Sequence, residues 1–159
     1  MPYDAAKGIL TEVWADRGLP IDPVWIAKQL GIDVVEANLP DDVSGALIKE
    51  TGKDPVIALC SSDSKSRKRF SCAHEIGHYI NRKRNGNESY EFVDLRSAMS
   101  STGQDPEEIY ANRFAAELLV PESQLRELHK EGMHSIILAF KFGVSDEVIN
   151  HRLRNLKLK

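Results

Sequence analysis

The chain has 159 residues, of which 42% are hydrophobic and 28% are charged. These proportions are ordinary for a globular protein and exclude a disordered or fibrous chain, and the length suits one well-buried core better than two. The formal net charge of -3 argues against a protein whose whole surface binds nucleic acid.

The N-terminal part of the chain predicts two helices followed by three strands. Apolar residues recur at helical spacing until Gly18 and Pro20 end the first pattern, and a second short pattern stops at Gly31. The turn residues 50–54 then separate two β-rich segments, as in a hairpin. We expect helices at residues 4–17 and 23–30, and strands from residue 32, at 44–49 and at 55–60.

The second half of the chain predicts mainly helices. A long helix is expected from 65 to 84, with Ser64 as its N-cap. The polar segment 85–104 is typical of a long surface loop that borders a cleft. Asp105 and Pro106 then begin a helix that runs to Leu119. Three shorter helices are expected around 122–131, 134–142 and 146–156.

Cysteine content and the N-terminus indicate where the protein acts. Cys60 and Cys72 are too few for a disulfide framework, and we interpret both as small buried residues. The first residues lack the basic and apolar regions of a signal peptide, and no apolar run approaches the roughly 18 residues that span a bilayer. We therefore expect no membrane segment and a cytoplasmic location.

Two histidines stand four residues apart in the long predicted helix, in the motif His-Glu-Ile-Gly-His at residues 74–78. Because residues four apart project from one helix face, the imidazoles of His74 and His78 can bind one metal ion. Glu75 lies about 100° around the helix from His74, where it can act as a general base without binding the metal. Zinc suits this site, since it accepts imidazole ligands, keeps one open position and activates water near neutral pH. The motif therefore predicts a zinc peptidase site.

The alternative is that the motif arose by chance on a solvated helix. Apolar residues on the same helix favour a packed element instead. They are Phe70, Ala73, Ile76 and Ile80.

A catalytic zinc needs a third protein ligand. A histidine six residues beyond His78 is absent, because that position is Arg84. Glu108 is the best candidate carboxylate, and Asn112 lies one turn later on the same face, where its amide could orient a ligand. However, Glu108 also fits the third position of a capping box with Asp105, and spacing alone favours that structural role. Glu91, Asp94, Glu107 and Glu117 are other possible ligands.

Two sequence blocks together indicate a family. The first is Arg-Phe-Ser-Cys-Ala-His-Glu-Ile-Gly-His at residues 69–78, a pattern that many zinc peptidases share. The second is Glu-Ile-Tyr-Ala-Asn-Arg-Phe-Ala-Ala-Glu-Leu-Leu-Val-Pro at residues 108–121, which is much more particular. In this order the blocks resemble the ImmA/IrrE family of metallopeptidases. The likeness extends to the strand at 45–48 and the tail at 144–153, so it spans most of the chain.

The resemblance implies an α+β fold. A small zincin-like domain at residues 1–121 would pack a three-stranded sheet on the histidine-bearing helix, and a short helical tail at 122–159, similar to a helix-turn-helix, would pack on that domain. It also implies a zinc endopeptidase with His74, His78 and Glu108 as ligands and Glu75 as base. Manganese could replace zinc, because imidazole and carboxylate ligands accept both.

The resemblance also suggests a substrate. Members of the family cleave helix-turn-helix repressors and so release genes of prophages, mobile elements or stress responses, which makes a repressor the expected partner here. Two alternatives stay open: a non-proteolytic regulator that binds a repressor, an antitoxin or DNA, and a zinc-dependent toxin that a partner neutralises. The strand at 56–59, if it lies at the sheet edge, could pair with an extended substrate.

The tail invites a DNA-binding hypothesis. Residues 139–149 contain an apolar helix, a glycine turn and a serine cap, as in a helix-turn-helix, and basic residues follow. Asp146 and Glu147 at the start of its second helix would repel phosphate. We therefore do not expect direct DNA binding, and the sequence indicates no oligomeric state.

Overall fold

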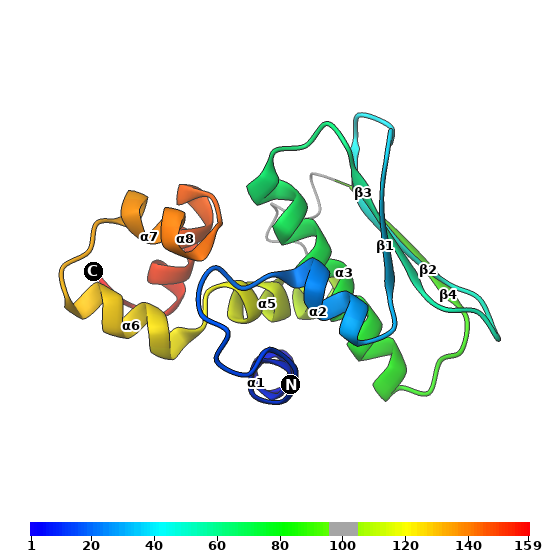
Figure 1. The fold of residues 1–159 in the computed structure, drawn as a ribbon, viewed down its shortest axis with the longest axis horizontal. Coiled ribbons are helices and arrows are strands. Elements are labelled where there is room, and N and C mark those ends of the chain that lie inside the picture. Colours follow the sequence, from blue (N-terminus) through cyan, green and yellow to red (C-terminus); the bar gives the residue numbers. More distant parts are fainter. Residues whose placement is uncertain (96–104) are drawn as a thin grey trace.

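The computed structural model describes residues 1–95 and 105–159 and has the expected α+β architecture (Figure 1). A mixed sheet lies at one end of the molecule, and a group of short helices forms the other end (Figure 1). The helices are α1 (Pro2–Ile9), continued by the π-helical segment η1 (Leu10–Trp14), α2 (Pro23–Gln29), α3 (Lys65–Arg84), α5 (Pro106–Leu119), α6 (Glu122–Lys130), α7 (Ser135–Phe142) and α8 (Asp146–Asn155). The strands are β1 (Asp33–Ala37), β2 (Val43–Lys49), β3 (Val56–Cys60) and β4 (Tyr90–Leu95).

The strands lie in the order β1-β3-β2-β4. The expected hairpin is present, since β2 and β3 pair antiparallel with Leu47 opposite Ile57. β1 pairs parallel to β3 on its other side. Both sides of β3 are therefore occupied, and the suggestion that residues 56–59 form a free edge for substrate is wrong.

A fourth strand, β4, corrects the expectation of a three-stranded sheet and of a loop throughout 85–104. It pairs antiparallel with β2 and places Phe92 opposite Leu47. Its side chains alternate, because Asp94 is buried whereas Glu91 and Val93 are exposed. The strand is short and stands within a polar segment, which explains why the sequence pattern did not reveal it. Residues 96–104, the rest of that expected loop, lie outside the described residues.

Helix α3 packs against β2 and β3 and spans the residues expected for it. Its N-cap is Ser64, whose hydroxyl accepts a hydrogen bond from the backbone N–H of Arg67 at 3.2 Å. The middle of the helix, residues 71–79, is buried, whereas both ends carry charged residues. No helix in the described ranges is both long and apolar enough to cross a membrane.

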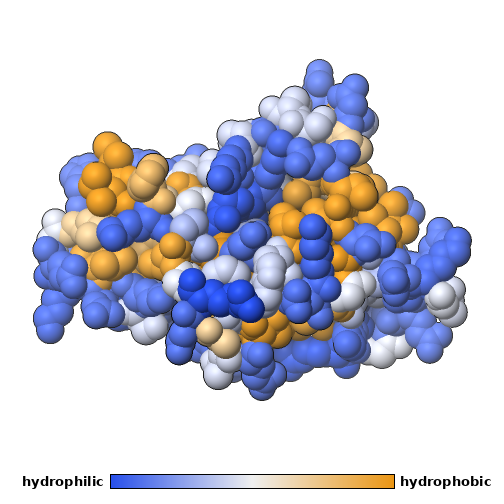
Figure 2. Space-filling view, in the orientation of Figure 1, coloured by the Kyte–Doolittle hydropathy of each residue, from blue (hydrophilic) through white to orange (hydrophobic). Residues whose placement is uncertain are grey.

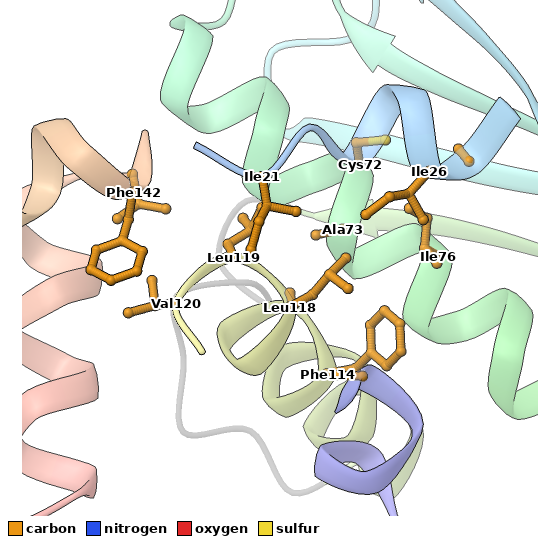
Figure 3. Close-up of a cluster of buried hydrophobic side chains, with 14 of the residues drawn as sticks. Ile21, Ile26, Cys72, Ala73, Ile76, Phe114, Leu118, Leu119, Val120 and Phe142 are labelled. Atoms are coloured by element: carbon orange, nitrogen blue, oxygen red, sulfur yellow. The ribbon is translucent and has the colours of Figure 1, made fainter. Parts of the chain in front are cut away.

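The hydrophobic core lies where α3 and α5 cross, and α1 and α2 close it from the side (Figure 3). The two long helices approach closely at Gly77, where a β-carbon would lie 3.0 Å from Cα of Ala111 and 3.2 Å from Cβ of Phe114. Gly77 therefore allows α5 to pack closely against α3. The labelled core residues are Ile21, Ile26, Cys72, Ala73, Ile76, Phe114, Leu118, Leu119, Val120 and Phe142.

The helical tail, α6 to α8, shares this core. Phe142 and Ile149 are fully buried within the same cluster as the residues of α3 and α5. Gly143, with a positive φ of 67°, ends α7, and Ser145 caps α8, which gives the helix-turn-helix-like connection expected from the sequence. The division into 1–121 and 122–159 stays a prediction.

Candidate metal centre

Helix α3 places three of the predicted residues in the interior. His74, Glu75 and His78 are at most 1% exposed. The helical spacing brings the Nε2 atoms of His74 and His78 to 3.2 Å from each other. Two imidazole nitrogens that face one another so closely require a proton or a cation between them.

Glu108 reaches the same point from α5. One carboxylate oxygen lies 3.0 Å from Nε2 of His74, and the other lies 3.1 Å from Nε2 of His78. Asp105 caps the N-terminus of α5 without help from Glu108, since the carboxylate of Asp105 accepts a hydrogen bond from the backbone N–H of Glu107 at 3.0 Å. Glu108 is therefore directed at the histidines, and not at the capping-box position that spacing alone favoured.

Asn112 lies one turn beyond Glu108 and contacts the outer nitrogen of a histidine. Its Oδ1 is 2.9 Å from Nδ1 of His74. An amide oxygen only accepts, so Nδ1 of His74 donates, and the lone pair of Nε2 is left to face the centre. The orienting role of Asn112 stays a prediction, for which this contact is the physical basis.

Strand β4 adds two side chains that sequence reasoning did not select. Asp94, named only as one possible ligand among several, is 2% exposed, and its Oδ1 lies 3.5 Å from Nε2 of both His74 and His78. The ring of Phe92 stacks on His78, with centroids 4.0 Å apart and an interplanar angle of 12°. The alternation of Tyr90, Phe92 and Asp94 was the available signal, because these positions share one strand face.

The structure does not bring the other possible ligands to the centre. Glu117 pairs with Arg152 in the tail, Glu107 pairs with Arg82 at 2.9 Å, and Glu91 is exposed on the outer face of β4. The centre therefore contains His74, Glu75 and His78 from α3, Asp94 from β4 and Glu108 from α5.

The carboxylates give the centre a strong attraction for positive charge. Burial alone would lower the pKa of a histidine, but Asp94 and Glu108 outweigh burial and raise the pKa of His74 to about 9. The pKa of His78 is raised for the same reasons. Burial, Asp94 and Glu108 together raise the pKa of Glu75 well above its ordinary value.

These residues fit a divalent metal ion. His74, Glu75, His78 and Asp94 each offer a ligand atom, and these atoms lie within 4.8 Å of one another. Both oxygens of Glu75 and Oδ2 of Asp94 are buried without a hydrogen-bond partner among the described residues. Buried polar atoms without partners indicate a missing ligand or ion. Imidazole and carboxylate donors suit zinc or manganese.

The chain is similar to known proteins in its family pattern, in its sequence and in its fold. The sequence model of the peptidase M78 family, described as the IrrE N-terminal-like domain, matches residues 27–154. An uncharacterized immunity region protein 2 of Bacillus phage phi105 is 30% identical over 101 residues, which are 64% of this chain and 60% of the phage protein. A solved Mycobacterium tuberculosis transcriptional regulator has the same fold, with a TM-score of 0.66, 19% identity and coverage of 96% of this chain and 46% of that chain. The chain thus spans less than two thirds of either relative.

Proposed function

We propose that this chain, which belongs to the peptidase M78 family of IrrE N-terminal-like domains, is a zinc-dependent endopeptidase that makes a specific cut in a helix-turn-helix repressor. The convergence of His74, His78 and Glu108 on one point, with Glu75 beside it, carries the proposal. Two imidazoles and a carboxylate are the ligand set of a catalytic zinc with an open position.

In this proposal each residue has a defined task. His74, His78 and Glu108 hold the metal, and Asn112 keeps His74 in the tautomer that binds through Nε2. Bound zinc would polarise the scissile carbonyl and make water acidic enough to attack it.

Glu75 is the proposed proton carrier. Its carboxylate is buried beside His74 and His78, close enough to a water at the metal to act as a general base. The carboxylate accepts a proton from the attacking water and donates it to the leaving amide nitrogen, so the charge on Glu75 is restored after each cut. Both of its oxygens are without a partner in the described part of the chain, which leaves them available for this transfer.

Edge strand β4 supports an extended substrate. Its one neighbour in the described sheet is β2, and it carries Phe92 and Asp94 into the centre. A substrate segment could pair with its other side and run past the metal, since main-chain pairing at a sheet edge is a common mode of peptide recognition.

The nature of the relatives supports a repressor as substrate. The phage protein is named for an immunity region, and the structural relative is titled a transcriptional regulator. DNA is a less suitable partner for the tail, since Asp146 and Glu147 begin α8 on its exposed side and the guanidinium of Arg152 is buried on Glu117.

A cleavage experiment tests the proposal. The purified protein would be incubated with zinc and helix-turn-helix repressors from the same genome, and fragments would be identified by mass spectrometry. We expect one cut, abolished in Glu75→Gln although this variant retains zinc. Glu12→Gln makes the same charge change at an exposed position of η1 and should cleave normally. Undiminished cleavage by Glu75→Gln would contradict the mechanism.

A second candidate is a regulator that binds its partner without cutting it. It is favoured by an apolar surface on α7, where Ile136, Ile137 and Phe140 are 61%, 50% and 86% exposed. Figure 2 shows apolar side chains gathered at this end of the molecule. Relief of repression that survives Glu75→Gln, with no cleaved product, would favour this candidate.

A further inference from the structure

Donor atoms of four side chains in the centre lie about as far apart as neighbouring corners of a tetrahedral zinc site. Ligands at about 2.0 Å from a tetrahedral zinc lie about 3.3 Å from one another. The Nε2 atoms of His74 and His78 are 3.2 Å apart. Oε2 of Glu108 lies 3.0 Å from Nε2 of His74, and Oε1 lies 3.1 Å from Nε2 of His78. Oδ1 of Asp94 lies 3.5 Å from both Nε2 atoms, so it fits the fourth corner.

The fold directs Asp94 to that corner. The pairing of β2 with β4 shifts register between Val43 and Gly45, which places a bulge beside Asp94. Bulges re-aim side chains and are frequent next to active sites. The hydroxyl of Ser44, within the bulge, donates a hydrogen bond to the backbone oxygen of Asp94 at 3.2 Å. The bulge and this hydrogen bond therefore fix the backbone of Asp94 beside the centre.

We infer that Asp94 is a fourth ligand of the metal and that it closes the centre in this conformation. A structural zinc has four protein ligands, whereas a catalytic zinc keeps one position for water or substrate. Asp94 takes that position. If the proposed peptidase function is correct, the protein is latent until Asp94 withdraws.

The position of β4 at the sheet edge would allow Asp94 to leave the centre. In the described sheet this strand is joined to β2 alone, at the edge farthest from β1. A partner that pairs with β4 and displaces it would withdraw Asp94, and would lift Phe92 from its stack on His78, while His74 and His78 keep their places on α3. Activation by a binding partner thus follows from the strand on which the fourth ligand lies.

A small anion tests whether the fourth position is open. The full-length protein would be loaded with one equivalent of Co²⁺, whose visible absorption reports its ligands, and titrated with azide. In the wild type the Asp94 carboxylate competes with azide for the metal, at an effective concentration of about millimolar or more. Azide should therefore bind Asp94→Ala at least about tenfold more tightly than it binds the wild type. Glu91→Ala removes an exposed carboxylate from the same strand and should behave as wild type.

The isosteric variant Asp94→Asn guards against a folding defect in Asp94→Ala. It preserves the shape of the side chain and offers a weaker ligand, so its affinity for azide should lie between those of the wild type and Asp94→Ala. Equal azide affinity in wild type and both Asp94 variants, each holding one cobalt, would overturn the inference. Loss of cobalt from folded Asp94→Asn would also overturn it, since a displaceable fourth ligand is not required for binding.

Cleavage of the repressor, measured on the same proteins, separates this inference from the proposed function. Azide binding that appears in Asp94→Ala without any cleavage supports the closed centre and counts against the peptidase. Cleavage by a wild-type protein that also binds azide freely supports the peptidase and rejects closure by Asp94.

Discussion

His74 and His78 are held by contacts of different kinds. Nδ1 of His74 donates to Asn112, as is usual for a histidine that binds a metal. Nδ1 of His78 has no hydrogen-bond partner in the described ranges, and the ring of this histidine instead stacks on Phe92. The guanidinium of Arg82 lies 4.9 Å from the other ring of the stack, Phe92, and is paired with Glu107.

Replacement of Asn112 by alanine should weaken zinc binding by about 10- to 100-fold, because the orientation and tautomer of His74 would no longer be fixed. Competition with a coloured chelator measures the affinity. Asn150→Ala is the matched control on α8, where the amide donates a hydrogen bond to the carboxylate of Asp146 at 2.9 Å, and it should bind zinc normally. Equal affinity in the two variants would show that Asn112 has no orienting role.

Replacement of Phe92 by leucine should weaken zinc binding by about two- to tenfold, because it removes the ring against which His78 is oriented. Phe92→Tyr keeps the ring and should retain most of the affinity. The same chelator competition measures both variants. If leucine and tyrosine gave the same affinity as phenylalanine, the stack would have no part in positioning His78.

The site residues on α3 were the part of the centre most predictable from the sequence. The spacing of His74, Glu75 and His78 was sufficient to place them together, because an α-helix fixes which residues share a face. Glu108 could not be separated from a capping residue by spacing, and only the family resemblance favoured it. Asp94 was one of several possibilities, since nothing local tells a strand residue which distant helix it will face.

At the scale of elements, the distance between α3 and α5 sets the distance between the histidines and Glu108. Gly77 permits the close approach, since a β-carbon there would meet the backbone of Ala111 at 3.0 Å. Backbone cannot move aside as a flexible side chain can, so any larger residue must separate the helices.

Gly77→Ala should lower the free energy of unfolding by about 1–3 kcal/mol through overpacking, and should weaken zinc binding as Glu108 moves away. Gly8→Ala is the matched control in α1, where a β-carbon meets nothing within 4 Å. Because alanine favours a helix over glycine, this control should be neutral or stabilising by about 0.5–1 kcal/mol. Urea unfolding measures both, and similar results for the two variants would contradict the close-packing role of Gly77.

The helices were predictable from sequence and the edge strand was not. Helix α3 matches its expected range because Ser64 and the polar residues after Arg84 mark its ends locally. β4 depends on pairing with β2, a partner far away in the sequence, for example Lys49 opposite Tyr90 and Gly45 opposite Asp94. Its order in the sheet, beside β2 and beyond β3, follows from tertiary packing alone.

At the scale of the whole molecule, a buried ion pair joins the tail to α5, the helix that carries Glu108. Arg152 of α8 contacts Glu117 of α5, both side chains are 2% exposed, and Nε of Arg152 donates to the backbone oxygen of Val120 at 3.1 Å. From the sequence, Glu117 was a possible metal ligand, and Arg152 is one of the basic residues that suggested DNA binding. The pair instead fixes the tail against the body of the molecule.

Arg152→Met should lower the free energy of unfolding by about 3–5 kcal/mol, because it leaves the charge of Glu117 buried without its partner. Arg126→Met breaks an exposed pair with Glu122 and should cost less than about 1 kcal/mol. Denaturant unfolding measures both. An equal, small loss in the two variants would show that the tail is not anchored by the buried pair.

The central claim is that one metal ion binds where α3, α5 and β4 meet. Native mass spectrometry of the whole protein titrated with zinc measures this most directly. We predict one zinc per chain in the wild type and in Glu75→Gln, and none in the double variant His74→Ala/His78→Ala at the same free zinc. A wild-type protein that holds no stoichiometric zinc, or a double variant that still holds one, would contradict the account.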